Sequence, residues 1–130
     1  MSAYERVRVN APPDAVVAGV RAALRARGIT EYAVVDHGHD MAAAGVPGVV
    51  AWTLVFGSPA AGAKLLERDL AAAVDIPLRL AVIADGSGGS EIVLRDMRSL
   101  LAADHADLAD AFTEVLRTLA DEQERSPHAP

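Results

Sequence analysis

The sequence has 130 residues, of which 52% are hydrophobic and 23% are charged; it has no cysteine, and its formal net charge is −6. A chain of this length is typical of one domain with its own core. The lack of cysteine excludes disulfides, thiolate nucleophiles and thiolate-bound metals. An acidic chain without a basic run does not favour binding to nucleic acid.

The composition and the hydropathy pattern also indicate where in the cell the protein is expected. Residues 1–10 are polar and charged, which does not fit a signal peptide. The longest apolar run, residues 41–57, is interrupted by Pro47 and several glycines, so no membrane span is predicted. Arginine is abundant while Lys64 is the single lysine, a bias typical of a high-GC bacterial genome. We therefore expect a cytoplasmic bacterial protein that does not associate with membranes.

The first part of the chain predicts two strands around one helix. Residues 4–9 predict a strand, because Val7 and Val9 share one face and Arg6 and Arg8 share the other. Asn10 is the expected cap of a helix whose first turn suits the prolines that follow, and Gly28 predicts the end of this helix. A second strand is expected over residues 32–35 and a short helical turn over residues 39–44. The buried stripe of the first helix is expected to be Val16, Val17, Val20 and Leu24.

The second part predicts three strands and two longer helices. Residues 49–56 are almost wholly apolar and predict a strand buried on both faces. A helix is expected from residue 59 to about residue 74, followed by a hairpin of strands 78–84 and 91–95. Asp104 is the expected cap of the last helix. The spacing predicts that one buried face of this helix carries Leu108, Phe112, Val115, Leu116 and Leu119.

These elements, in the order β-α-β-β-α-β-β-α, predict an α+β fold. The expected architecture has two layers, a curved and largely antiparallel sheet with helices on one face. Residues 1–121 are expected to form a single domain. Residues 122–130 are polar and include prolines, so a disordered C-terminal tail is predicted there.

Several short motifs occur in an order and spacing that resemble the domain-of-unknown-function family 302. They are Asp36-His37, Gly45, the segment 55–59 (Val-Phe-Gly-Ser-Pro) with Gly62 and Leu65, and the segment 75–79 (Asp-Ile-Pro-Leu-Arg). The resemblance covers roughly residues 7–105. It implies a small dimeric α/β domain with a TATA-binding-protein-like sheet. No catalytic residue is assigned in that family, so the resemblance implies none here.

The start of the second long helix is the first candidate site. Gly57, Ser58, Gly62 and Lys64 lie between a buried strand and this helix, in a pattern close to a nucleotide phosphate loop. The glycine-to-lysine spacing is one residue, and Leu65 replaces the hydroxyl residue that would hold magnesium. Two interpretations remain: an ordinary helix start capped by Ser58, or a site for an anion at the helix N-terminus.

The turn from Asp36 to Met41 is the second candidate. The unperturbed pKa of a histidine side chain lies near neutrality, so His37 is a candidate general acid or base, and Asp36 lies beside it. His37 and His39 would share one face of an extended chain and could also bind a metal, although Asp36 would then face the other way. The alternative is a turn in which Asp36 bonds backbone amides. We predict no metal site and no cofactor.

The third candidate is Arg79, two residues after Pro77. It could form an ion pair with Asp75, or it could hold an anion at the rim of a pocket.

Three functions are compatible with these candidates. The preferred hypothesis is a small-ligand-binding or accessory domain, in which the Asp36-His37 turn meets the Gly57-Ser58 turn and forms a pocket for a small anionic ligand together with Lys64 and Arg79. One alternative is an acid-base enzyme that uses His37. The other is a dimeric assembly module without a site. A homodimer is expected because short apolar sheets have edges or faces to protect.

Overall fold

Five antiparallel strands form one sheet with the order β1-β5-β4-β3-β2 in the computed structural model, which describes residues 4–128. The first strand pairs with the last, Tyr4 opposite Arg95, and strands β2 and β1 form the two edges. The strands are β1 (Tyr4–Val9), β2 (Thr30–Asp36), β3 (Ala51–Gly57), β4 (Leu78–Ala84) and β5 (Ser90–Arg95).

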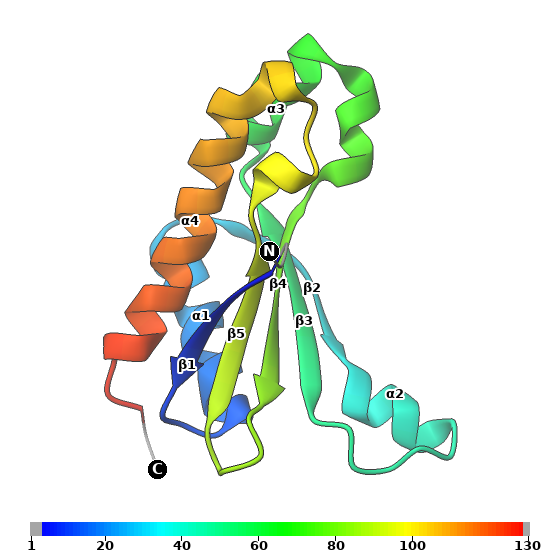
Figure 1. The fold of residues 1–130 in the computed structure, drawn as a ribbon, viewed down its shortest axis with the longest axis vertical. Coiled ribbons are helices and arrows are strands. Elements are labelled where there is room, and N and C mark those ends of the chain that lie inside the picture. Colours follow the sequence, from blue (N-terminus) through cyan, green and yellow to red (C-terminus); the bar gives the residue numbers. More distant parts are fainter. Residues whose placement is uncertain (1–3, 129–130) are drawn as a thin grey trace.

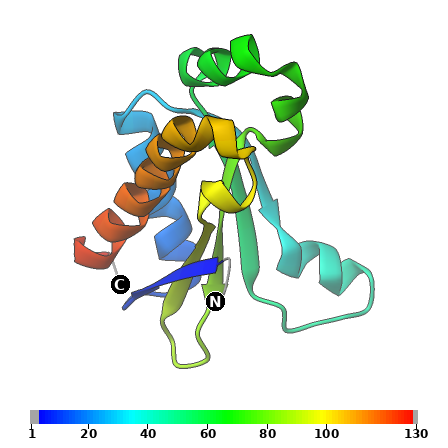
Figure 2. The same cartoon turned by 45° about the horizontal axis from the view of Figure 1, so that its top comes forward.

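Two long helices, α1 (Pro13–Ala26) and α4 (Ala106–Arg125), lie side by side on one face of the sheet (Figures 1 and 2). Figure 1 shows α2 (His37–Ala43) at one end of the molecule and α3 (Pro59–Arg68) at the other. Three short 3₁₀ helices complete the fold: η1 (Leu70–Asp75), η2 (Met97–Ser99) and η3 (Ala103–His105). The α+β architecture with helices on one face of an antiparallel sheet, predicted from the sequence, is confirmed.

The core lies between the sheet and α1 and α4. Alternate strand residues point toward the helices because successive side chains in a strand face opposite sides. The apolar stripes of the two helices meet them, and burial of this surface is the main force that holds the layers together. The most deeply buried side chains are Val16, Val20, Leu24, Leu54, Phe56, Leu65, Leu80, Val82, Ile92, Leu94, Leu116 and Leu119.

Strand β3 differs from the expectation that both of its faces are buried. Leu54 and Phe56 point into the core and are fully buried, whereas Thr53 and Val55 are only half-buried. The reason is that α1 and α4 cover one face of the sheet only, so alternate residues of β3 lie on the other face. The apolar composition of the strand does not reveal this alternation.

The predicted helix over residues 59–74 is two helices. Asp69 adopts an extended conformation after α3, and its side chain accepts a hydrogen bond from the amide of Ala71 at 3.0 Å. Asp69 therefore ends α3 and caps η1. The cap predicted at Asn10 is also wrong, since Pro12 occupies the N-cap position of α1.

The last helix corrects two further expectations. Val115 is 37% exposed, so it lies at the edge of the buried face. The helix begins at Ala106, preceded by η3, and Asp104 does not cap it. It continues to Arg125, so residues 122–125 are helical rather than part of a disordered tail. Gln123 is buried and accounts for this extension, because its side chain packs over Gly19 of α1.

Candidate functional site

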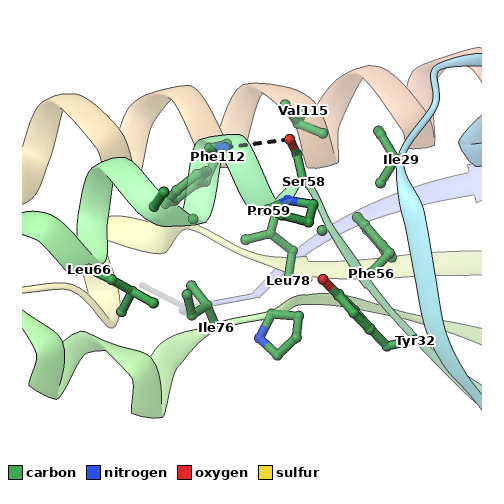
Figure 3. Close-up of a pocket in the computed structure, with 15 residues that line it drawn as sticks. Ile29, Tyr32, Phe56, Ser58, Pro59, Leu66, Ile76, Leu78, Phe112 and Val115 are labelled. Carbon is green, nitrogen blue, oxygen red and sulfur yellow. Dashed lines mark hydrogen bonds between the residues drawn. The ribbon is translucent and has the colours of Figure 1, made fainter.

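A cavity of about 450 Å³ lies where the end of β3, the first turns of α3 and the middle of α4 meet; we call it the α3 pocket. Figure 3 shows side chains from these elements and from β2 facing a common space. Its lining consists of Ile29, Tyr32, Phe56, Gly57, Ser58, Pro59, Ala61, Gly62, Ala63, Leu66, Ile76, Pro77, Leu78, Phe112 and Val115.

The start of α3 forms one wall of this pocket. Ser58 has an extended backbone and occupies the N-cap position, and its hydroxyl oxygen accepts a hydrogen bond from the amide of Ala61 at 3.4 Å. Pro59 follows at the first helical position, where the missing amide proton costs nothing. The expected capped helix start is therefore present, and it brings the Ser58 hydroxyl to the pocket.

A glycine inside α3 contributes space to the pocket. A Cβ atom added to Gly62 would lie 3.6 Å from Cδ1 of Ile76, which is an ordinary van der Waals distance. Packing therefore does not require glycine at this position. A longer side chain on Gly62 would extend toward Ile76 and take up volume that is now open.

A β-bulge in β2 places Tyr32 at the pocket. Glu31 pairs with Phe56 and Ala33 pairs with Val55, so Tyr32 is an extra residue between two successive pairs. Bulges of this kind redirect a side chain relative to the strand. The Tyr32 ring lies beside Gly57, because a Cβ atom on that glycine would be 3.6 Å from Cε2 of the ring. Figure 3 shows the tyrosine hydroxyl pointing into the space between β2 and α3.

The chemistry of the α3 pocket is apolar with two hydroxyl groups. Ser58 and Tyr32 carry the polar side-chain atoms of the lining, and none of the lining residues has a charged side chain. A pocket of this kind suits an apolar molecule that carries a hydrogen-bonding group. It does not supply a cation that would hold a phosphate or a carboxylate.

The structure distributes the predicted ligand-binding residues over two faces. Gly57, Ser58 and Gly62 were predicted as ligand-binding residues from one motif, and all of them line the α3 pocket. Lys64 is exposed on α3 and does not line this pocket, and Arg79 lies in a second hollow on the opposite face of the sheet. The predicted pocket formed by all of these residues together is therefore not present.

The Asp36-His37 turn lies at the other end of the β2-β3 pair, so the predicted contact with Ser58 is wrong. Asp36 pairs with Trp52, whereas Gly57 pairs with Thr30 at the opposite end. Five residue steps of β3 separate these pairs, about 17 Å along an antiparallel strand. The connection through α2 does not fold back across the sheet, and the two turns stay at opposite ends (Figure 1).

The side chains of this turn have structural partners. Asp36 caps α2, and its carboxylate accepts a hydrogen bond from the amide of His39 at 3.0 Å. His37 is half-buried, and its Nε2 atom lies 2.7 Å from Oγ1 of Thr53. Over residues 4–128, no group of three or more His, Asp or Glu side chains is arranged to hold a metal ion. In the same range, no helix combines the length and the apolar character needed to cross a membrane.

Tyr32, Phe112 and Val115 are pocket residues that the sequence did not indicate. Phe112 and Val115 were expected to belong to the core, and they lie where α4 passes over the start of α3. Tyr32 reaches the pocket because of the bulge, and no glycine or proline marks that bulge in the segment from Thr30 to Asp36.

Comparisons with known proteins agree with the fold. No curated protein matches the chain. A crystal structure of an uncharacterized conserved protein DUF302 from Bacillus stearothermophilus has a TM-score of 0.86 with this structure. The two are 15% identical, and the match covers 96% of this chain and 100% of the other. A family model described as "Domain of unknown function DUF302" matches residues 5–124. The chain therefore belongs to the DUF302 family, as its motifs indicated.

Proposed function

We propose that this chain is a small-molecule-binding domain and that the α3 pocket takes an apolar molecule with one hydrogen-bonding group. The observation that carries the proposal is the cavity itself, about 450 Å³ in volume, with two hydroxyl groups in an otherwise apolar lining. Binding sites for small molecules are commonly of this size and have few polar groups, which fix the orientation of the ligand. The polar group of the ligand would face the hydroxyls of Ser58 and Tyr32.

Gly62 supports this proposal because a glycine inside a helix lowers the stability of the protein. A glycine inside a helix lowers stability by roughly 0.5–1 kcal/mol relative to alanine, because it loses more backbone freedom on folding. The space around Gly62 accepts a Cβ atom, so packing does not explain the residue. A glycine at position 62 leaves volume open in the pocket, and this explains why the residue is a glycine.

Tyr32 supports the proposal through its placement. Tyr32 stands at a bulge on an edge strand, so its side chain can face the pocket without belonging to a ladder pair. Tyr32 as a whole residue is 52% exposed, and its ring lies beside Gly57 at the end of β3. A ligand in the pocket would cover part of this ring and receive a hydrogen bond from its hydroxyl.

The first test measures binding of a neutral fluorescent probe, N-phenyl-1-naphthylamine, to the parent protein, to a variant whose pocket is filled by a larger side chain, and to a matched control variant. We expect the probe to bind the parent protein. Ala61→Leu places three extra carbons in the pocket and should weaken binding by at least about tenfold, or ~1.4 kcal/mol. Ala60→Leu adds the same bulk to the neighbouring exposed position, which does not line the pocket, and should leave binding unchanged.

The second test addresses the hydroxyl groups. Tyr32→Phe should weaken binding of 1-naphthol by roughly three- to tenfold, the loss of one hydrogen bond. It should not weaken binding of naphthalene, which has no hydroxyl. The proposal is wrong if the parent binds neither probe, or if Ala61→Leu and Ala60→Leu bind N-phenyl-1-naphthylamine as the parent does. Thermal melts by circular dichroism confirm that each variant is folded.

A further inference from the structure

The face of the sheet that points away from α1 and α4 carries a concentration of arginines. Strand alternation places the side chains of Arg6, Arg79 and Arg95 on this face, from three neighbouring strands. Arg6 stands opposite Val93, and Val93 stands opposite Ala81. In a chain whose net charge is −6, this grouping of positive side chains on one face is unexpected.

These arginines surround a hollow of about 560 Å³, which we call the sheet hollow. Its floor is apolar and includes Ala81 and Val93. Its rim includes Val74 of η1 and Leu100, which directly follows η2. Charged lining residues are three arginines and one aspartate, Asp75. The sheet hollow therefore combines an apolar floor with an excess of positive charge.

The three arginines differ in what they already bind. The guanidinium of Arg6 is 2.8 Å from the carboxylate of Glu91 and is thereby neutralised. The guanidinium of Arg95 lies 4.9 Å from the centre of the Tyr4 ring and donates a hydrogen bond to the tyrosine hydroxyl at 3.4 Å. It remains without a carboxylate partner among residues 4–128.

Arg79 is the arginine that remains open for a ligand. Its side chain is exposed on β4, a strand inside the sheet, and it has no hydrogen-bond or ion-pair partner among residues 4–128. The ion pair with Asp75 considered from the sequence does not form in this structure, although both residues line the hollow. A guanidinium group presents a planar set of donors that fits the oxygen atoms of a carboxylate or a phosphate.

We propose that the sheet hollow binds a small amphipathic anion. Arg79 takes the carboxylate or phosphate group, Arg95 adds a second positive charge, and the apolar part of the ligand lies over Ala81 and Val93. This site is separate from the α3 pocket, which lies on the helix-covered side of the sheet and has no charged lining residue. The two linings have Pro77 and Leu78 in common.

The test is isothermal titration calorimetry at pH 7 with octanoate, octyl phosphate and neutral octanol. We expect at least one of the two anions to bind about tenfold more tightly than octanol, and binding to weaken with added salt. Octanoate and octyl phosphate separate the two head groups, and preference for either supports the proposal. Equal binding of octanol and both anions would overturn it.

Variants locate the site. Arg79→Gln removes the charge from an exposed side chain and should weaken binding of the anion by about tenfold or more. Arg25→Gln is the matched control, since this arginine is exposed on α1 and its side chain also has no partner among residues 4–128. It should bind the anion as the parent does. A thermal melt checks that Arg79→Gln retains the fold.

The outcomes distinguish this inference from the proposed function. Anion binding that is lost in Ala61→Leu and kept in Arg79→Gln would place the ligand in the α3 pocket, and the sheet hollow would then not be an anion site. A different result would be that Arg79→Gln converts a dimer to a monomer in light scattering without any anion present. That result would make this face an interface between copies and would also overturn the inference.

Discussion

The side chain of Gln123 in α4 occupies the space directly above Gly19 in α1, where a Cβ atom would overlap its amide group. Gln123 is buried, and its Oε1 atom lies 2.9 Å from Nε2 of His128. The two helices therefore approach closely at this point because Gly19 has no side chain. This contact also explains why α4 extends through a polar segment to Arg125.

Gly19 in α1 and Gly62 in α3 give opposite predictions for the same substitution. Gly19→Ala should destabilise the protein by up to about 2 kcal/mol, because displacing the buried amide end of Gln123 costs more than the ~0.5–1 kcal/mol gained by removing a helical glycine. Gly62→Ala should stabilise it by roughly 0.5–1 kcal/mol, because its environment accepts a Cβ atom. Urea unfolding measures both. Destabilisation by Gly62→Ala would mean that the space beside Ile76 is filled.

A second prediction concerns the buried face of α4. Phe112 is 7% exposed, and Phe112→Ala should cost roughly 3–5 kcal/mol of the free energy of unfolding, because it leaves a cavity beside the core. Val115 lies one turn further and is 37% exposed, so Val115→Ala serves as the control with a loss below about 1 kcal/mol. Denaturant unfolding of both variants checks the helix register. Equal losses would contradict it.

A third prediction concerns the stability of the fold at low pH. Hydrogen bonds from the Arg68 guanidinium, both 2.9 Å long, lower the pKa of Asp107 to about 2. Because the folded pKa lies below the unfolded value near 3.9, the pair stabilises the fold above that value and loses its contribution as pH falls toward 2. The effect is small because both side chains are largely exposed.

Asp107→Asn should therefore lower the urea midpoint at pH 7 and leave it nearly unchanged at pH 2. Arg68→Gln should have the same effect at pH 7, and the double variant should lose no more than either single variant, since both remove one interaction. Additive losses in the double variant would show that the two residues act independently.

The homodimer expected from the sequence stays a prediction. Leu70 and Val74 in η1 are 78% and 80% exposed, which is unusual for large apolar side chains and favours a contact with a second copy. Light scattering at micromolar concentration should give twice the monomer mass, and Leu70→Asp should reduce it to the monomer mass. A monomeric parent protein would contradict this prediction.

Local patterns predicted the elements of the fold well. The alternation of arginine and valine over residues 6–9 and the turn residues around strand 78–84 indicated β1 and β4 with the bounds that the structure has. Ser58 and Pro59 likewise marked the start of α3, because the requirements of a helix N-terminus are local. Gly28 has a positive φ of 66° just after α1, which fits its predicted role as a helix stop.

Properties that depend on two distant segments were not predicted. The candidate site was expected to join Asp36-His37 with Ser58, yet antiparallel pairing of β2 with β3 holds these turns at opposite ends. The bulge at Tyr32 depends on the register of that pairing and has no signature in the strand itself. Residues 122–125 look like a solvated tail, and they are helical because of contacts with α1, including the ion pair of Glu122 with Arg27.

The pairing of β1 with β5 has a consequence for the order of folding. Tyr4 and Arg95 are partners although most of the chain lies between them, and Arg117 of α4 then binds Glu5 of the same edge strand. During synthesis β1 leaves the ribosome long before either partner exists. Strand β1 therefore cannot join the sheet before the C-terminal part of the chain has been made, and we predict that its pairing is among the last contacts to form.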